Sequence, residues 1–92
     1  MSDSFQDKFI RRGGVTLLSK SDALLFIKEC AKEKIEILGI DGFLLFGDKI
    51  QPSLENSIDF TASNAKQGNI YEQALNFIEP IDNKYYFEVV YE

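Results

Sequence analysis

Four carboxylate residues in the middle of the chain are the first candidates for chemistry: Asp41, Asp48, Glu55 and Asp59, all within nineteen residues. Clustered carboxylates can bind Mg²⁺ or Ca²⁺, and a pair of them flanking a cleft can hydrolyse a glycosidic bond. Their spacing matches no calcium-binding loop, and the chain has no tryptophan on which a sugar ring would stack. We therefore expect acids that face solvent or a protein partner, with no metal and no cofactor. An enzyme that combines these carboxylates with a metal is the alternative.

The rest of the composition also argues against an enzyme. The chain has no histidine and one cysteine, Cys30. Histidine is the side chain best suited to general acid-base catalysis near neutral pH and the commonest metal ligand, and nucleophilic sites often pair a serine or cysteine with it. A single cysteine can form neither an intramolecular disulfide nor a multi-cysteine metal site. We expect Cys30 to pack as a small hydrophobic residue, and we predict no catalytic residues.

The net charge of −5 is unevenly distributed. Residues 1–34 contain seven basic and five acidic residues, whereas residues 35–92 contain three basic and ten acidic residues. Such an acidic segment repels phosphates, so we expect no direct binding of nucleic acid. The same field attracts a basic protein and speeds its association. A surface that serves only solubility is the simpler alternative.

Aromatic residues are interleaved with these acids. Most must lie in the core, but a sheet covered on one side leaves its other face open, and Tyr86 and Val90 are candidates for that face. Protein interfaces are enriched in tyrosine, so Phe46 and Tyr86 are predicted aromatic anchors. The predicted partner-binding residues are Asp41, Phe46, Asp48, Glu55, Asp59 and Tyr86. A structural or adaptor module, most simply a homodimer through the open face or the final strand, is the alternative.

Hydrophobic periodicity predicts the elements that position these residues. The expected elements are a strand over 15–18, a helix over 20–34, a strand over 35–46, its pairing partner with extended stretches over 49–51 and 57–61, a helix starting at 70, and a strand over 84–91. Ser19 and Asn69 are predicted helix N-caps. Gly13-Gly14 breaks the chain, and the role of residues 1–14 is left open.

The long strand is interrupted at Gly39-Ile40-Asp41-Gly42, where the alternation slips. Glycines inside a strand indicate a bulge or a close approach of another backbone. Gly47-Asp48 is a two-residue hairpin signal. Pro52 either ends the pairing that follows or places it at an edge of the sheet.

The length of 92 residues and a hydrophobic content of 45% predict that residues 1–92 form a single α+β domain with one core. The element order is strand, helix, strand, strand, helix, strand. Its simplest packing is a four-stranded antiparallel sheet with two helices on one face, and a ferredoxin-like split arrangement is one topology with this order.

The N-terminal residues include no apolar segment typical of a signal peptide. No apolar run approaches the ~18–20 residues that would cross a bilayer, so no membrane partner is expected. Together with the single free thiol, this predicts a cytoplasmic protein.

Residues 22–42 read DALLFIKECAKEKIEILGIDG. This stretch resembles the immunity proteins of tRNA-cleaving colicins, in which a helix with a cysteine and alanines also leads into a strand reading ILGIDG. The match covers about a quarter of the chain, and residues 37–42 are its most specific part. After Gly42 the sequence departs from the family, because FLLF replaces a more polar run that contains tryptophan.

The resemblance implies an inhibitor that binds a toxic ribonuclease domain in the cytosol and blocks its active site. Such proteins place acids and aromatic rings where the RNA would lie, and by this resemblance Asp41 lies near the interface. The expected partner is therefore a basic protein, a nuclease toxin domain. Its association is expected to slow sharply as the salt concentration rises.

Overall fold

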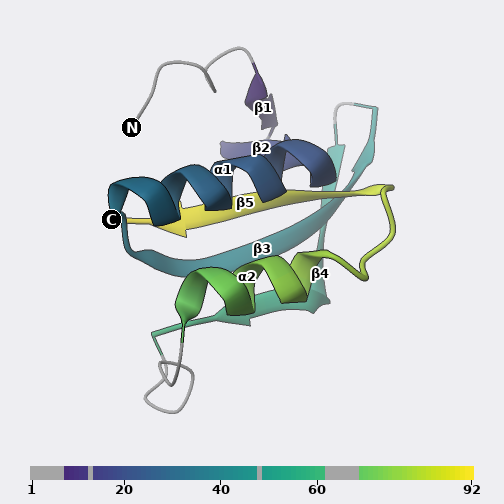
Figure 1. The fold of residues 1–92 in the computed structure, drawn as a ribbon. Coiled ribbons are helices and arrows are strands. Elements are labelled where there is room, and N and C mark those ends of the chain that lie inside the picture. Colours follow the sequence, from purple (N-terminus) through teal and green to yellow (C-terminus); the bar gives the residue numbers. More distant parts are fainter. Residues whose placement is uncertain (1–7, 13, 48, 62–68) are drawn as a thin grey trace.

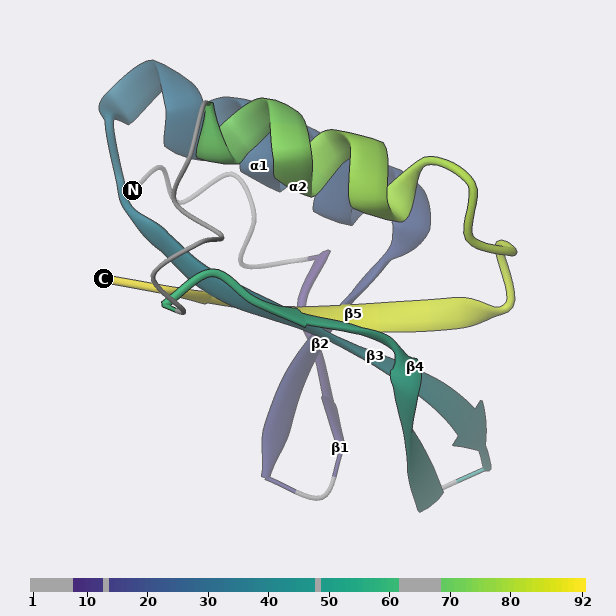
Figure 2. The same ribbon diagram turned by 90° about the horizontal axis from the view of Figure 1, so that it is seen from below.

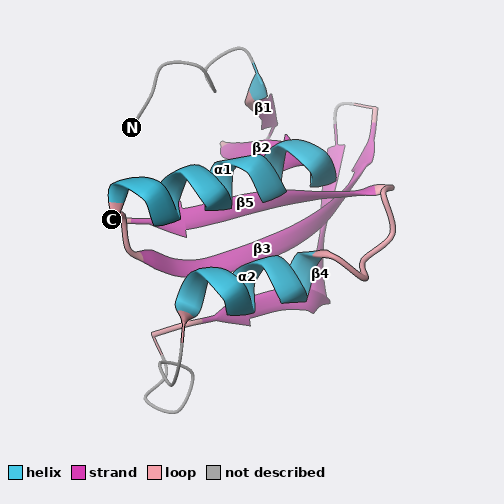
Figure 3. Cartoon of the chain, viewed as in Figure 1, coloured by secondary structure: helices cyan, strands magenta, loops and turns pink. Residues whose placement is uncertain are grey.

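The computed structural model describes residues 8–12, 14–47, 49–61 and 69–92. Within these residues, five strands form one antiparallel sheet in the order β1-β2-β5-β3-β4, and two helices cover the same face of it (Figures 1 and 3). In chain order the elements are β1 (Ile10–Arg12), β2 (Val15–Ser19), α1 (Lys20–Glu33), β3 (Ile37–Phe46), β4 (Lys49–Asp59), α2 (Ile70–Ile78) and β5 (Tyr85–Tyr91).

The predicted four-stranded sheet is wrong, because a fifth strand, β1, pairs with the outer edge of β2. The order also differs from a ferredoxin-like sheet, in which the last strand lies at an edge, whereas β5 is central here. Each helix nevertheless joins two parallel strands that have one strand between them. α1 connects β2 to β3 across β5, and α2 connects β4 to β5 across β3.

Both predicted helix caps are confirmed. The Ser19 hydroxyl accepts a hydrogen bond from the Asp22 N–H at 3.4 Å, and the Asn69 side-chain oxygen accepts from the N–H groups of Tyr71 and Glu72 at 2.9 and 3.2 Å. α1 ends where Lys34 adopts a left-handed conformation with φ 59°. These local signals explain why both helix boundaries lie close to the predicted ones.

The core lies between the helices and the sheet. α1 contributes Ala23, Phe26, Ile27 and Cys30, which follow the i, i+3, i+4, i+7 spacing of a buried helix face. The other fully or almost fully buried residues of this cluster are Leu18, Ile37, Ile40, Phe60, Ala74, Ile78, Phe87 and Val89. The alternation predicted for the last strand is confirmed, since Phe87 and Val89 point towards the helices and are buried.

The break predicted around Asp41 is confirmed as a pair of irregularities in β3. On the β5 side the register shifts between Ile37 and Gly39, and on the β4 side it shifts between Ile40 and Gly42. Ile40 pairs with Ile58 whereas Gly42 pairs with Ser53, so β4 has three more residues than β3 over this interval. We call residues 54–57 the β4 bulge. Pro52 lies in β4, which is an edge strand of the sheet, and this is one of the two outcomes predicted for it.

Cys30 is fully buried, as predicted. Burial, with smaller contributions from Glu33 and Glu29, raises the pKa of its thiol from 9.0 to about 11. A thiol reagent at pH 8 should therefore react with native Cys30 far more slowly than with the protein in denaturant, because the thiolate is the nucleophile. Rapid labelling of the native protein would contradict this placement.

The raised pKa of Cys30 also predicts how stability changes with pH. The folded state retains this proton more strongly than the unfolded state, so the contribution is complete below about pH 9 and is lost as the pH rises towards about 11. Chemical denaturation of the native protein and of Cys30→Ala between pH 8 and 11 measures this loss, since the variant lacks it.

In the described part of the chain, no helix has the length and apolarity needed to cross a membrane.

Candidate partner-binding surface

None of the described residues forms a helix on the other face of the sheet, and the β1–β2 and β3–β4 hairpins bend away from the helix layer on that side (Figure 2). We call it the helix-free face. The strand register assigns residues to it, because Asp41 is opposite Glu88 and Phe43 is opposite Tyr86, while their strand neighbours Ile40, Phe87 and Val89 lie under the helices. By the same alternation the face also includes Leu17, Val90 and Asp59.

A pair of like charges lies in the middle of the helix-free face. Asp41 and Glu88 are direct cross-strand neighbours in β3 and β5, and neither strand contains a basic residue. Side chains in such a pair have Cβ atoms roughly 4.5–5.5 Å apart, and like charges there destabilise the sheet. A cation from a partner placed between the two carboxylates would remove this repulsion.

Asp59 extends the acidic region along β4. Asp41, Asp59, Gly39 and Val90 line one shallow depression of about 340 Å³. The Asp59 carboxylate accepts hydrogen bonds from the Thr61 hydroxyl at 2.6 Å and the Thr61 N–H at 2.8 Å. These bonds fix the direction of the carboxylate and lower its pKa below 3.8, so it carries a full negative charge at neutral pH.

Thr61→Val should raise the pKa of Asp59, because the hydroxyl hydrogen bond stabilises the charged carboxylate. The lowered pKa gives a stabilising contribution that is present above about pH 4 and is lost as the pH falls through the folded-state value. Titration of the Asp59 carboxyl signal by NMR in both proteins measures the change. An unchanged titration midpoint in Thr61→Val would contradict the assigned hydrogen bond.

Apolar side chains form the floor beside these acids. Leu17 is fully buried and Phe43 is 7% exposed, yet neither belongs to the cluster beneath the helices. Tyr86 is half-buried next to Phe43, and Val90 is 38% exposed. The surface therefore combines carboxylates with a partly exposed tyrosine and valine, a composition suited to a protein interface.

The structure brings together only part of the predicted set. Asp41, Asp59 and Tyr86 share the helix-free face. Phe46 is exposed at the end of β3, opposite Lys49 and away from the Asp41–Glu88 pair. Glu55 is exposed in the β4 bulge, the part of β4 that passes Asp41. The remaining predicted residue, Asp48, lies outside the described residues.

Sequence reasoning did not include Glu88 in the binding set, although a signal for it existed. The alternation in β5 places Glu88 on the same side as Tyr86. The missing information was the pairing of β5 with β3, which sets Glu88 directly against Asp41. Phe43 was missed because a phenylalanine in a strand is expected to face the main core.

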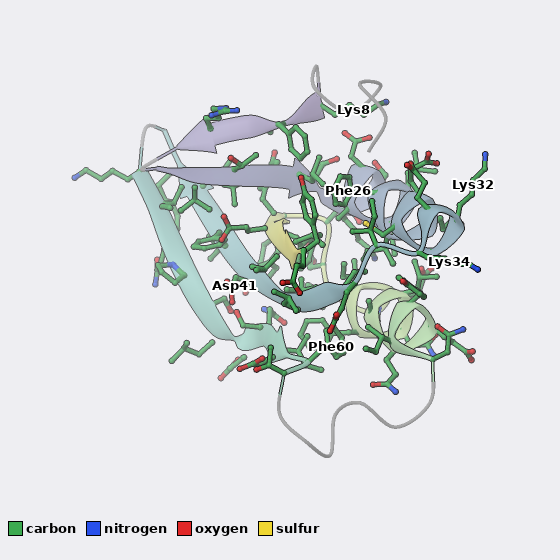
Figure 4. The ribbon with its side chains drawn as sticks, turned by 90° about the vertical axis from the view of Figure 1, so that its left-hand side faces the viewer. Lys8, Phe26, Lys32, Lys34, Asp41 and Phe60 are labelled. Atoms are coloured by element: carbon green, nitrogen blue, oxygen red, sulfur yellow. The ribbon has the colours of Figure 1, made fainter. Side chains whose placement is uncertain are left out.

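Lysines lie at both ends of α1, in the other layer of the molecule. Lys32 and Lys34 project from the end of α1, on the far side of the core from Asp41 (Figure 4). Lys20, at the other end of α1, donates a hydrogen bond to the Glu79 carbonyl at 2.6 Å. The helix layer carries charges of both signs, because α1 also contains Asp22, Glu29 and Glu33.

No group of three or more metal-ligating side chains occurs among the described residues.

Comparisons with protein-family models, with curated proteins and with solved structures found no match for this chain.

Proposed function

We propose that this protein is a non-catalytic inhibitor that binds a basic nuclease toxin domain through its helix-free face, in the manner of the immunity proteins its sequence resembles. The observation that carries the proposal is the Asp41–Glu88 pair, which is not balanced by any basic residue of β3 or β5. Asp59 adds a third carboxylate nearby, and Tyr86 supplies an aromatic contact.

Inhibition would follow from occupation of the toxin's cationic groups. A ribonuclease holds its substrate through basic side chains that contact phosphates, and the three carboxylates would engage those side chains in place of RNA. Tyr86 and the floor formed by Phe43 would supply the desolvated centre that tight interfaces need. No bond is made or broken, and no cofactor takes part. The inhibitor would act in the cytoplasm, where the RNA substrate is found.

The experiment that tests the proposal is rescue of growth in bacteria. A small basic nuclease domain encoded beside this gene is expressed from an inducible promoter, with and without this protein. Survival only in the presence of this protein is the expected result. Continued cell death when both are expressed as soluble proteins would overturn the proposal.

A second measurement uses the purified pair. The association rate should fall steeply as the salt concentration rises, because steering by exposed charges is screened over a Debye length of about 8 Å at physiological ionic strength. Equal association rates at low and high salt would count against an interface built on the helix-free face.

The homodimer alternative makes a different prediction. A two-fold contact through the helix-free face would bring the carboxylates of two chains together, and each chain has a net charge of −5. We therefore expect a monomer by sedimentation velocity at low salt. A stable dimer under those conditions would favour the alternative.

A further inference from the structure

β2 and β5 separate after only two residue pairs. Leu18 pairs with Phe87 and Ser19 pairs with Tyr86, and no further pair joins the two strands. Continuation of the same register would have set Thr16 against Val89. β2 is paired with β1 on its other side and β5 with β3. Two backbone edges therefore face each other with no described strand between them: residues 15–17 of β2 and residues 88–91 of β5. We call this opening the β2–β5 wedge.

The β2–β5 wedge contains a pocket of about 350 Å³. Its helix side is lined mainly by Leu18, Val89 and a row of three aromatic rings, with the polar side chains of Thr16 and Arg11 beside them. Phe26 is at the centre of that row, with ring centroids 5.8 Å from Phe9 and 5.3 Å from Tyr91. The pocket is large enough for an aliphatic side chain that enters from the open edge.

The edge of β5 in the wedge has little of the protection that strand edges usually carry, since its one charged residue is Glu88. β5 contains no lysine and no proline, and Val90 and Tyr91 are 38% and 43% exposed. Natural sheets block such edges with charges, proline or bulges, because an unpaired edge readily accepts another strand. Addition of an extended peptide to a sheet edge is a common mode of recognition.

The two sides of the wedge specify what the added strand would carry. Side chains of a strand alternate between the two faces of the sheet, so every second residue would point into the apolar pocket. The residues between would point to the helix-free face, where Glu88 and, one strand further, Asp41 are negative. Arg11 lines the wedge on the helix side but already has an interaction within the protein. The favoured occupant therefore alternates apolar and basic residues.

We infer that the β2–β5 wedge accepts an extended segment of the basic partner as an additional strand, with its apolar side chains in the pocket and its basic side chains towards Glu88. This inference deepens the proposed function and rests on it, since it names the part of the partner that is held. A second copy of this chain is a poorer occupant, because its own β5 would set Glu88 against Glu88.

The test uses the full chain and synthetic peptides rather than a toxin. One capped peptide of about seven residues alternates lysine and valine, and its control has the same residues in two blocks. We expect the alternating peptide to bind about tenfold more tightly by NMR titration, with the largest amide shifts at Val89 and Tyr91. Equal affinity of the two peptides, or shifts centred elsewhere, would overturn the inference.

A matched pair of variants tests the backbone contact. The Glu92 N–H donates to the Glu36 carbonyl at 3.0 Å on the β3 side, so the N–H of Tyr91 points to the opposite side, into the wedge. Tyr91→Pro removes this N–H, while Tyr91→Ala removes only the ring. Provided both variants melt cooperatively, Tyr91→Pro should bind the alternating peptide about tenfold more weakly than Tyr91→Ala. Equal binding by the two would exclude strand addition at this edge.

The peptide assay separates the two proposals because it contains no toxin domain. Failure of the peptides alongside successful rescue of growth would overturn the strand inference alone. Failure of rescue overturns the proposed function whatever the peptides do. A dimer in sedimentation that dissociates when the alternating peptide is added would assign the wedge to a second copy instead of the partner.

Discussion

Replacing Asp41 and Glu88 together by lysine is expected to raise the Kd for the nuclease domain by about 100-fold or more. Both residues lie at the centre of the helix-free face and directly oppose each other. The double variant turns the region that would attract cations into one that repels them. The fall in affinity is expected in both rates, with slower association from lost steering and faster dissociation from lost ion pairs. Surface plasmon resonance at several salt concentrations measures both.

The control for this variant changes the net charge equally but on the helix layer. Glu29→Lys with Glu79→Lys adds the same positive charge to α1 and to the end of α2, so it should leave the dissociation rate nearly unchanged. Equal weakening by the two double variants would show that net charge alone governs binding. The Asp41–Glu88 variant should also fold normally, because it replaces one like-charged cross-strand pair with another of opposite sign.

The helices were predictable because their signals are local. Ser19 and Asn69 are typical N-cap residues, and a capping hydrogen bond joins each of them to an N–H group two or three residues further along the chain. The contacts made by the buried face of α1 were less predictable, because they involve residues distant in the sequence. Phe26 is fully buried, and the rings of Phe9, just before β1, and of Tyr91 in β5 pack against it.

The fifth strand was missed although a signal for it was present. β1 has only three residues, two of them arginine, so it shows no alternation. Gly13-Gly14 was interpreted as a break, yet a Gly-Gly pair between two extended segments is also a hairpin turn signal. Gly14 has a φ of 81°, which such turns require and which glycine adopts at no steric cost.

The candidate surface could be predicted only in part, because it depends on which strands become neighbours. Alternation within β5 assigned Tyr86 and Glu88 to one side without showing what that side faces. The insertion of β5 between β2 and β3 sets Glu88 against Asp41, and no feature of the local sequence specifies that order. Phe46 was grouped with Asp41 by its position in the chain, whereas it lies at the hairpin end of β3, opposite Lys49.

Gly42→Ala is expected to destabilise the fold by about 1–3 kcal/mol, the usual cost of forcing extra atoms into a well-packed region. A Cβ at this position would lie 2.5 Å from the Asn56 carbonyl oxygen and 2.9 Å from the Asn56 Cβ. The nearer atom belongs to the backbone, so the β4 bulge itself must move. For a domain of this size the expected fall in melting temperature is about 4–8 °C per kcal/mol, measurable by circular dichroism.

Gly39→Ala is the matched comparison, because the nearest atom to its added Cβ is the Ile58 carbonyl oxygen at 3.0 Å. The smaller overlap should give a smaller loss. Equal losses, or a larger one at Gly39, would contradict the assigned packing of the β4 bulge against β3.

The loss at Gly42 should also be coupled to the hydrogen bonds that hold the β4 bulge. The Gly42 N–H donates to the Ser57 hydroxyl at 3.1 Å, and that hydroxyl donates to the Ser53 carbonyl at 2.8 Å. Ser57→Ala alone should cost about 1 kcal/mol. In the Gly42→Ala background the bulge is already displaced, so the same substitution should cost clearly less, which a double-mutant cycle measures. Strict additivity would mean that Gly42 and the bulge act independently, and the close approach beside Asp41 would then have no role in holding β4 in register.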